Sequence, residues 1–161
     1  MKNYIEGYKA FEHDFCNKHG VKFDVGQNYH IDGPVKSGIS GCGFHISVCP
    51  EFTFRFVNSD PEPILCEVIG YGKISDEGGD EYFGEYDIYA CSYIYIKRIV
   101  PRVEIIEMAK GLCEYKLERF LSTYKITDEE AEIIEGTFKR YDFMKKKHID
   151  YYHYGQKDVY Y

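Results

Sequence analysis

Residues 41–57 read GCGFHISVCPEFTFRFV, and this stretch decides the fold that we expect for the chain. Gly41 and Gly43 leave the backbone free to make a tight turn. From Phe44 onward, apolar and polar residues alternate for five positions, which is typical of a half-buried strand. Pro50 suits the first position of a helix, where its missing N–H group costs nothing. We therefore expect a central strand that is followed at once by a short helix.

Five further segments show the alternation or the apolar runs of strands. They are residues 4–11, 21–25, 28–31, 64–74 and 88–100. In the last segment, strict alternation places Lys97 and Arg98 on opposite faces of the strand. In the first segment, Lys9 shares a face with Phe11, and we expect its ammonium group to lie in solvent.

After Pro101 the apolar residues recur every three or four positions, as on one face of an α-helix. This pattern predicts an amphipathic helix of about six turns over residues 106–124. Thr127 and Glu130 then form a capping box, which predicts the start of a second helix.

Together these segments predict an α+β protein. Residues 1–100 form a small, twisted, mostly antiparallel sheet with one short helix. Residues 101–161 form a C-terminal α-helical hairpin with a Tyr-rich tail, and we expect the two parts to pack as one globular unit.

The composition is that of a folded protein. The chain has 161 residues, of which 44% are hydrophobic, and no apolar run approaches the length of a membrane span. Six cysteines are spread through apolar segments: Cys16, Cys42, Cys49, Cys66, Cys91 and Cys113. A chain of this length does not require cross-links, so we interpret all six as reduced thiols in the core of a cytoplasmic protein.

The negative charge of the chain is concentrated in one third of its length. The net charge is −7, and residues 59–90 alone carry −8, because nine acidic residues stand against Lys73. A field of this sign repels nucleic acid and attracts cationic surfaces. We therefore expect a protein partner with a basic surface, no membrane association and no direct nucleic-acid binding.

The segment DEGGDEYFGEYD at residues 76–87 combines carboxylates with aromatic rings. Tyrosine is typical of the energetically important positions in protein interfaces. The candidate binding residues are Asp76, Glu77, Asp80, Glu81, Tyr82, Phe83, Glu85, Tyr86 and Asp87. The alternative is that the aromatic rings cover a small core and the carboxylates are simply solvated.

Five short motifs follow one another in the first two thirds of the chain. They are YKAF at residues 8–11, GVKFDVGQNY at 20–29, CGFHISVCP at 42–50, CEV at 66–68 and ACSYIYI at 90–96. In this order and at this spacing they resemble a small domain of unknown function that is common in phage and prophage proteins. The two helices and the tail lie outside the resemblance.

The resemblance implies a phage or prophage accessory protein that acts inside the host cell. Combined with the acidic segment, it leads us to expect a protein that binds and inhibits a host protein. A nucleic-acid-directed defence factor would be such a target, as for anti-CRISPR proteins. The alternative is a structural or scaffolding module of a phage particle, which self-associates through the C-terminal helices.

More distantly, the chain resembles the core of the ADP-ribosyltransferases. The run GFHI at residues 43–46, followed by the expected helix, is similar to a strand and short helix of that family. Glu85 precedes the last strand, as the catalytic glutamate of the family does. The resemblance implies NAD as cofactor, with Lys9, His45 and Ser47 around it and Glu85 as the catalytic carboxylate. A protein that acts only by binding needs no cofactor.

Two of these residues also have simpler interpretations. Glu85 is one of six acidic residues in a twelve-residue segment, and a solvated carboxylate is the interpretation that this density of charge favours. His45 is either a ligand-binding residue or a hydrogen-bonded structural residue of the strand.

Cys42, His45 and Cys49 would need Cys16 or His13 to complete a zinc site. The sequence lacks a paired Cys-x-x-Cys spacing, so we expect no metal.

Overall fold

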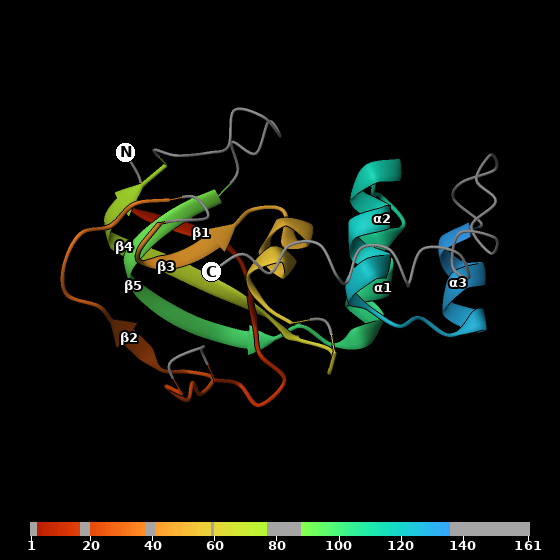
Figure 1. The fold of residues 1–161 in the computed structure, drawn as a ribbon, viewed down its shortest axis with the longest axis horizontal. Helices are drawn as coiled ribbons and strands as arrows, with labels where there is room; N and C mark the ends of the chain where they lie inside the picture. Colours follow the sequence, from red (N-terminus) through yellow and green to blue (C-terminus); the bar gives the residue numbers. More distant parts are fainter. Residues whose placement is uncertain (1–2, 17–19, 38–40, 59, 77–87, 136–161) are drawn as a thin grey trace. The chain divides into compact units, whose positions relative to one another are not determined.

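The structure, a computed structural model, describes residues 3–16, 20–37, 41–58, 60–76 and 88–135 (Figure 1). The chain divides into two units, Met1–Val100 and Pro101–Tyr161. The elements of the first unit are β1 (Tyr4–Phe11), β2 (Asn28–His30), β3 (Phe44–Ser47), the 3₁₀-helix η1 (Pro50–Phe56), β4 (Ile64–Ser75) and β5 (Ile88–Ile99). Those described in the second unit are α1 (Arg102–Ala109), α2 (Glu114–Thr123) and α3 (Asp128–Glu135).

Four of the strands close into an antiparallel barrel, and the fifth extends it. The sheet order is β2-β5-β3-β1-β4, and a further pairing between β4 and β5 closes the ring. Strands β2 and β3 occupy successive halves of one edge of β5. The molecule is therefore a sheet-rich α+β protein with a few short helices. The prediction of that class and of strands at residues 4–11, 28–31, 64–74 and 88–100 is confirmed.

Irregular pairing between β4 and β5 gives the long strands the bend that a four-stranded barrel needs. The register shifts twice, between Glu67 and Val68 and between Tyr71 and Ile74. At the second shift, Gly72 takes a positive φ of 82°, which suits glycine. Bulges of this kind bend a strand and increase its twist.

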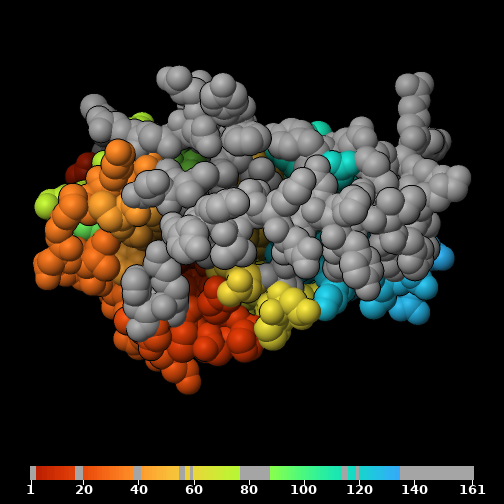
Figure 2. Space-filling view, viewed as in Figure 1, coloured from red at the N-terminus to blue at the C-terminus, as the bar shows by residue number. Residues whose placement is uncertain are grey.

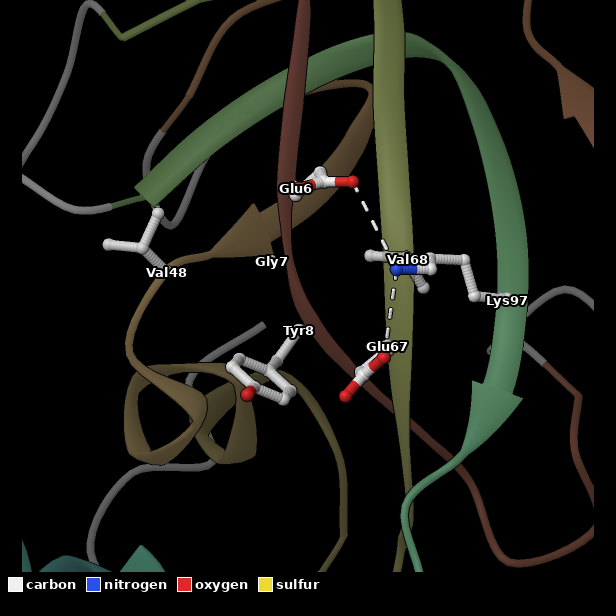
Figure 3. Close-up of a pocket in the computed structure, with 7 residues that line it drawn as sticks. All are labelled: Glu6, Gly7, Tyr8, Val48, Glu67, Val68 and Lys97. Atoms are coloured by element: carbon white, nitrogen blue, oxygen red, sulfur yellow. Dashed lines mark ion pairs between the residues drawn. The ribbon is translucent and has the colours of Figure 1, made fainter.

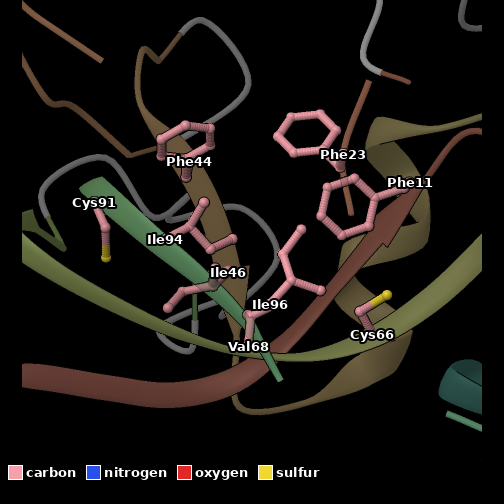
Figure 4. Packing of buried hydrophobic residues seen from close by; sticks show 9 residues of the cluster. All are labelled: Phe11, Phe23, Phe44, Ile46, Cys66, Val68, Cys91, Ile94 and Ile96. Atoms are coloured by element: carbon pink, nitrogen blue, oxygen red, sulfur yellow. The ribbon is translucent and has the colours of Figure 1, made fainter. Parts of the chain in front are cut away.

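The barrel is filled by one cluster of apolar side chains (Figure 4). Its buried members are Phe11, Phe23, Phe44, Ile46, Cys66, Val68, Cys91, Ile94 and Ile96. The rings of Phe11 and Phe23 lie 4.8 Å apart at an interplanar angle of 53°. Burial of a large apolar side chain of this kind contributes about 1.5–3 kcal/mol. Because alternate residues of a strand point to opposite faces, the cluster also defines which residues point outward.

A glycine allows the barrel to close between β1 and β3. The two strands share one pair of register partners, Tyr8 and Ser47. A Cβ atom on Gly7 would lie 2.5 Å from the carbonyl oxygen of Ser47, which is too close for any side chain. Glycine at this position therefore permits the approach of the two backbones.

The central stretch forms the predicted strand and helix, and the helix is of the 3₁₀ type. Helix η1 begins with Pro50, as predicted, and contacts both β1 and β3. It is largely buried, since Glu51, Phe52, Thr53 and Phe54 are all buried residues.

The prediction of a strand at residues 21–25 is wrong. One isolated bridge, between Cys16 and Lys22, is the β-pairing found there. The reason is that Phe23 enters the core while its neighbours Val21 and Val25 remain exposed. This connection lies at the surface, where red to orange atoms are visible in the space-filling view (Figure 2).

The prediction of one long helix over residues 106–124 is also wrong, because the chain breaks between α1 and α2. The N–H groups of Lys110, Gly111 and Leu112 donate to carbonyl groups three residues earlier, which is the tight pattern of a helix end. Glycine has a low helix propensity, so the break occurs at Gly111. The predicted hairpin of two helices is therefore not confirmed in this form.

The capping box at the start of α3 is confirmed. The N–H group of Thr127 donates to a Glu130 carboxylate oxygen at 2.8 Å, and the N–H group of Glu130 donates to Thr127 Oγ1 at 3.2 Å. Glu130 also accepts a hydrogen bond from Nε of Arg102, in α1, at 2.6 Å. The predicted continuation of this helix beyond Glu135, and the Tyr-rich tail, lie outside the described residues.

None of the helices described here is both long enough and apolar enough to cross a membrane.

Candidate functional site

The outward-pointing residues of β2, β5, β4 and β1 form a continuous surface, which we call the outer face. Strand register arranges it as three rows that run across the strands. The first row is His30, Tyr93, Tyr71 and Tyr4; the second is Asn28, Tyr95, Ile69 and Glu6; the third is Arg98, Glu67 and Tyr8.

We call the first row the aromatic row, and three of its four rings are stacked. The rings of His30 and Tyr93 lie 4.2 Å apart at 25°, and those of Tyr93 and Tyr71 lie 5.0 Å apart at 18°. The hydroxyl group of Tyr71 donates to Oδ1 of Asn28 at 2.9 Å, which fixes its ring. Tyr4, at the end of the row, is 41% exposed. Rigid tyrosine rings of this kind offer a large contact area at little cost in conformational entropy.

A β-bulge at Lys97 organises the third row. Glu67 is the register partner of Arg98, and Val68 is the partner of Ile96, so Lys97 has no partner in β4. The extra residue turns Lys97 and Arg98 toward the same carboxylate, since both form ion pairs with Glu67. The prediction that Lys97 and Arg98 point to opposite faces is therefore wrong, because it assumed strict alternation.

A cavity of about 240 Å³ opens at this end of the outer face (Figure 3). It is lined by Glu6, Gly7, Tyr8, Val48, Glu67, Val68 and Lys97. Figure 3 shows the ammonium group of Lys97 between the carboxylates of Glu6 and Glu67. The ion pairs are 4.0 Å long to Glu6 and 3.8 Å long to Glu67.

The two carboxylates of this cavity differ in burial and in their ion pairs. Glu67 is the more buried carboxylate and binds both Lys97 and Arg98. Glu6 is 57% exposed, and its ion pair within the described residues is the long one to Lys97. The cavity therefore contains a cation that its two carboxylates hold loosely.

Comparison with protein families identifies the first unit. Residues 5–100 match the family described as a domain of unknown function, DUF7666. The chain belongs to the DUF7666 family. The matched region contains the whole barrel except the first residue of β1, and therefore nearly all of the outer face and its cavity. Comparisons with curated proteins and with solved structures gave no match.

Lys9 of the DUF7666 domain points into the barrel. Its register partner is Cys66, whose thiol belongs to the core cluster. Lys9 Nζ donates a hydrogen bond to the carbonyl oxygen of His45 at 3.3 Å and lies 5.4 Å from the centre of the Phe11 ring. Burial lowers the pKa of Lys9 to about 8. The prediction of a solvated lysine is therefore wrong, since the side chain shares the inner face with Phe11.

His45 and Ser47 occupy the opposite side of the DUF7666 barrel wall from Lys9. Their neighbours Phe44 and Ile46 belong to the core, so alternation directs His45 and Ser47 outward. Ser47 is nonetheless buried, and its Oγ accepts a hydrogen bond from the N–H group of Cys49 at 3.1 Å. The structure thus brings Lys9 close to the backbone of His45 and does not place the candidates Lys9 and Ser47 in one cavity.

Most of the candidate residues of the acidic segment lie outside the described residues. Asp76 is described and exposed. The other candidates are not described: Glu77, Asp80, Glu81, Tyr82, Phe83, Glu85, Tyr86 and Asp87. The segment connects the end of β4 to the start of β5, the two strands that carry Tyr71 and Tyr93.

The cysteines of the chain are free thiols, but they do not all lie in the core. Cys66 and Cys91 are buried, and burial raises their pKa to about 12 and about 11, respectively. Cys42 and Cys113 are exposed. The prediction of six core thiols is wrong for these two, since Cys42 lies in an isolated bridge to Lys36 and Cys113 immediately precedes α2. Cys16 and Cys49 are only half-buried.

In the part of the chain that the structure describes, no three His, Cys, Asp or Glu side chains are placed to hold a metal ion. The thiol of Cys42 instead donates to the carbonyl oxygen of Pro34 at 3.1 Å. A zinc site built on Cys42, His45 and Cys49 therefore has no support from the geometry.

Sequence reasoning missed the outer face of the DUF7666 domain. The alternation in residues 88–100 places Tyr93 and Tyr95 on one face of their strand. Their partners on the neighbouring strands follow only from the strand register. One signal was present: Glu67 is a lone acidic residue in an apolar strand, and two adjacent cations end the last strand. A buried carboxylate requires such partners.

Proposed function

We propose that the protein is a phage or prophage accessory protein that binds and inhibits a host protein with a basic surface. It acts by occupying that surface, and a component of a nucleic-acid-directed defence system is the target class that we favour. It needs no cofactor for this, and it acts in the cytoplasm of the host cell.

The outer face is the single observation that carries the binding role. It combines a stacked aromatic row with the exposed carboxylate of Glu6, and the rings at the ends of the row can attract the guanidinium groups of arginine. The family domain that presents this face is acidic, so its field favours encounter with a basic partner. The acidic segment at residues 76–87 adds to the same field.

The experiment compares capture of host proteins by matched variants of the full chain. Tyr4→Ser combined with His30→Ser removes the two ends of the aromatic row, which are both exposed. Val21→Ser combined with Val25→Ser removes two exposed side chains that belong to none of the three rows. A bacterial protein that binds the wild type and the control variant, and is lost with the first variant, supports the proposal. Retention of every captured protein by the first variant contradicts it.

The described residues give less support to an ADP-ribosyltransferase. Lys9 points into the barrel while Ser47 points away from it, so the two do not face one NAD pocket. Incubation with labelled NAD distinguishes the two activities. Transfer of label by the wild type, abolished by Glu85→Gln, would replace the binding proposal with an enzymatic one.

A further inference from the structure

The cavity beside Gly7 already contains a cation supplied by the protein itself. Lys97 reaches from β5 across β4, so that its ammonium group lies between Glu6 of β1 and Glu67 of β4 (Figure 3). The presence of this group demonstrates that a cation fits between the two carboxylates.

Lys97 is held weakly in that position. Charge-assisted hydrogen bonds between nitrogen and carboxylate oxygen are about 2.7–2.9 Å long. The distances of 4.0 and 3.8 Å from Lys97 are both longer, and its side chain is 40% exposed. Exposed ion pairs of this kind contribute about 0–1 kcal/mol. A second cation can therefore displace Lys97 at little cost.

We propose that this cavity binds one arginine side chain of a protein partner, whose guanidinium group displaces Lys97 from Glu6 and Glu67. The inference rests on the proposed function, because it assigns the recognition of the basic partner to one place on the outer face. Lys97 then turns toward solvent, which its exposure permits.

The lining of the cavity favours arginine over other cations. A guanidinium group has five N–H donors in a planar fork, so it can donate to both carboxylates at once, whereas an ammonium group is a point charge. Its plane can stack on the ring of Tyr8, and Val48 offers an apolar contact for the aliphatic part of the side chain. A metal ion would have only two carboxylate ligands here. Among the described residues, no group of three His, Cys, Asp or Glu side chains is placed to hold one.

The neighbouring ion pair keeps the site in place while Lys97 leaves. Arg98 binds the other side of Glu67, so this carboxylate stays neutralised and oriented. Glu6 has no such second cation among the described residues and loses its ion-pair partner when Lys97 moves. Glu6 is therefore the carboxylate that gains most from an incoming arginine.

The test is an NMR titration of the ¹⁵N-labelled full chain with N-acetyl-arginine amide. We expect saturable shifts at the backbone amides of Gly7, Tyr8 and Val48. N-acetyl-citrulline amide, which has nearly the same shape without the charge, should not produce them. The absence of saturable shifts with the arginine compound, or equal shifts with the citrulline compound, overturns the proposal.

Two variants should change the affinity in opposite directions. Glu6→Gln should weaken binding about fivefold, and Lys97→Met should strengthen it about fivefold, since each alters roughly 1 kcal/mol of ionic interaction. Asp24→Asn and Lys36→Met make the same changes in net charge at exposed positions outside the cavity. If these controls match Glu6→Gln and Lys97→Met, the binding is non-specific and the proposal fails.

The test of the arginine site can fail while the proposed binding role holds. The amide spectrum of each variant reports whether the barrel has folded. A partner protein that depends on Tyr4 and His30, in a chain that does not bind the arginine compound, would refute the arginine site and leave the binding role intact.

Discussion

Lys9 and His45 are joined from inside the barrel. Lys9 Nζ donates to the carbonyl oxygen of His45 at 3.3 Å, across two strands that share one pair of register partners. The ammonium group thus bridges β1 and β3, yet burial lowers its pKa to about 8, so the folded state disfavours its charge.

The first prediction concerns pH. The pKa of Lys9 is lower in the folded state than its ordinary value of 10.5, so the unfolded chain binds more protons between these two values. The contribution of Lys9 to the free energy of unfolding should therefore rise as the pH increases from about 8 to about 10.5, by at most roughly 3 kcal/mol. The raised pKa values of Cys66 and Cys91 act in the opposite direction above pH 9. The measurement is therefore the difference in free energy of unfolding between the wild type and Lys9→Met, from urea unfolding at several pH values.

The matched variant for that prediction is Lys9→Met, which replaces the charge by an apolar side chain of similar length. This variant should lack the contribution of Lys9 to the free energy of unfolding above pH 8. At pH 7 its free energy of unfolding should equal that of the wild type or exceed it by up to about 1–3 kcal/mol, as for other buried charges. Strong destabilisation at pH 7 would show that the bond to His45 outweighs the cost of burial.

The second prediction concerns Gly7. Gly7→Ala should destabilise the first unit by about 1–3 kcal/mol, because its new methyl group would overlap the backbone of Ser47. Gly111→Ala is the control, since its Cβ would lie 3.8 Å from the nearest neighbour. It should change stability by less than about 1 kcal/mol. Equal effects of the two substitutions would refute the close approach of β1 and β3.

The third prediction concerns the start of α3. A hydrogen bond from Arg102 lowers the pKa of Glu130, with further help from Thr127. This stabilisation is present above the ordinary pKa of glutamate and is lost as the pH falls through the lowered value. Glu130→Ala should therefore destabilise α3 by about 1 kcal/mol at pH 7 and have less effect in acid. Helical circular dichroism at pH 7 and pH 3 tests this, and an undiminished effect at pH 3 contradicts it.

The fourth prediction concerns the thiols. Cys42 and Cys113 should react rapidly with a thiol reagent in the native protein, because both are exposed. Cys66 and Cys91 should react only after unfolding, since burial protects them and raises their pKa. The combined Cys42→Ser and Cys113→Ser variant should lose the part of the rapid phase that these two thiols contribute, while the half-buried Cys16 and Cys49 still react before unfolding. Rapid labelling of Cys66 would mean that the barrel opens.

The fifth prediction concerns the acidic segment. Glu81→Lys combined with Glu85→Lys should slow association with a captured basic partner about tenfold at low salt, and the difference should shrink at high salt. Asp24→Lys combined with Glu132→Lys changes the net charge equally at exposed positions elsewhere. Stopped-flow association rates compare the two. A partner that binds both variants at the same rate does not use the segment.

The sequence predicts most of the strands, because their apolar residues alternate with polar ones or follow one another in short runs. Residues 4–11 become β1 with the same limits, and the stretch around Pro50 becomes a strand and a short helix. The capping box at Thr127 also forms as predicted. These features depend on local rules, which a single sequence contains.

The features that the sequence does not predict depend on contacts between distant residues. Phe23 is buried because its ring packs in the core of the barrel, although no strand forms around it. Lys9 points inward because β1 is paired along its whole length with β4. The cavity beside Gly7 needs the register of three strands and one irregularity, so no local pattern indicates it.

The bulge at Lys97 amounts to one inserted residue in an otherwise regular ladder. A relative that lacked this single codon would keep Arg98 opposite Glu67 and Ile96 in the core, but it would have no ammonium group beside Glu6. The cavity with its internal cation is therefore one insertion or deletion away from a cavity without it, and neither change would alter the core.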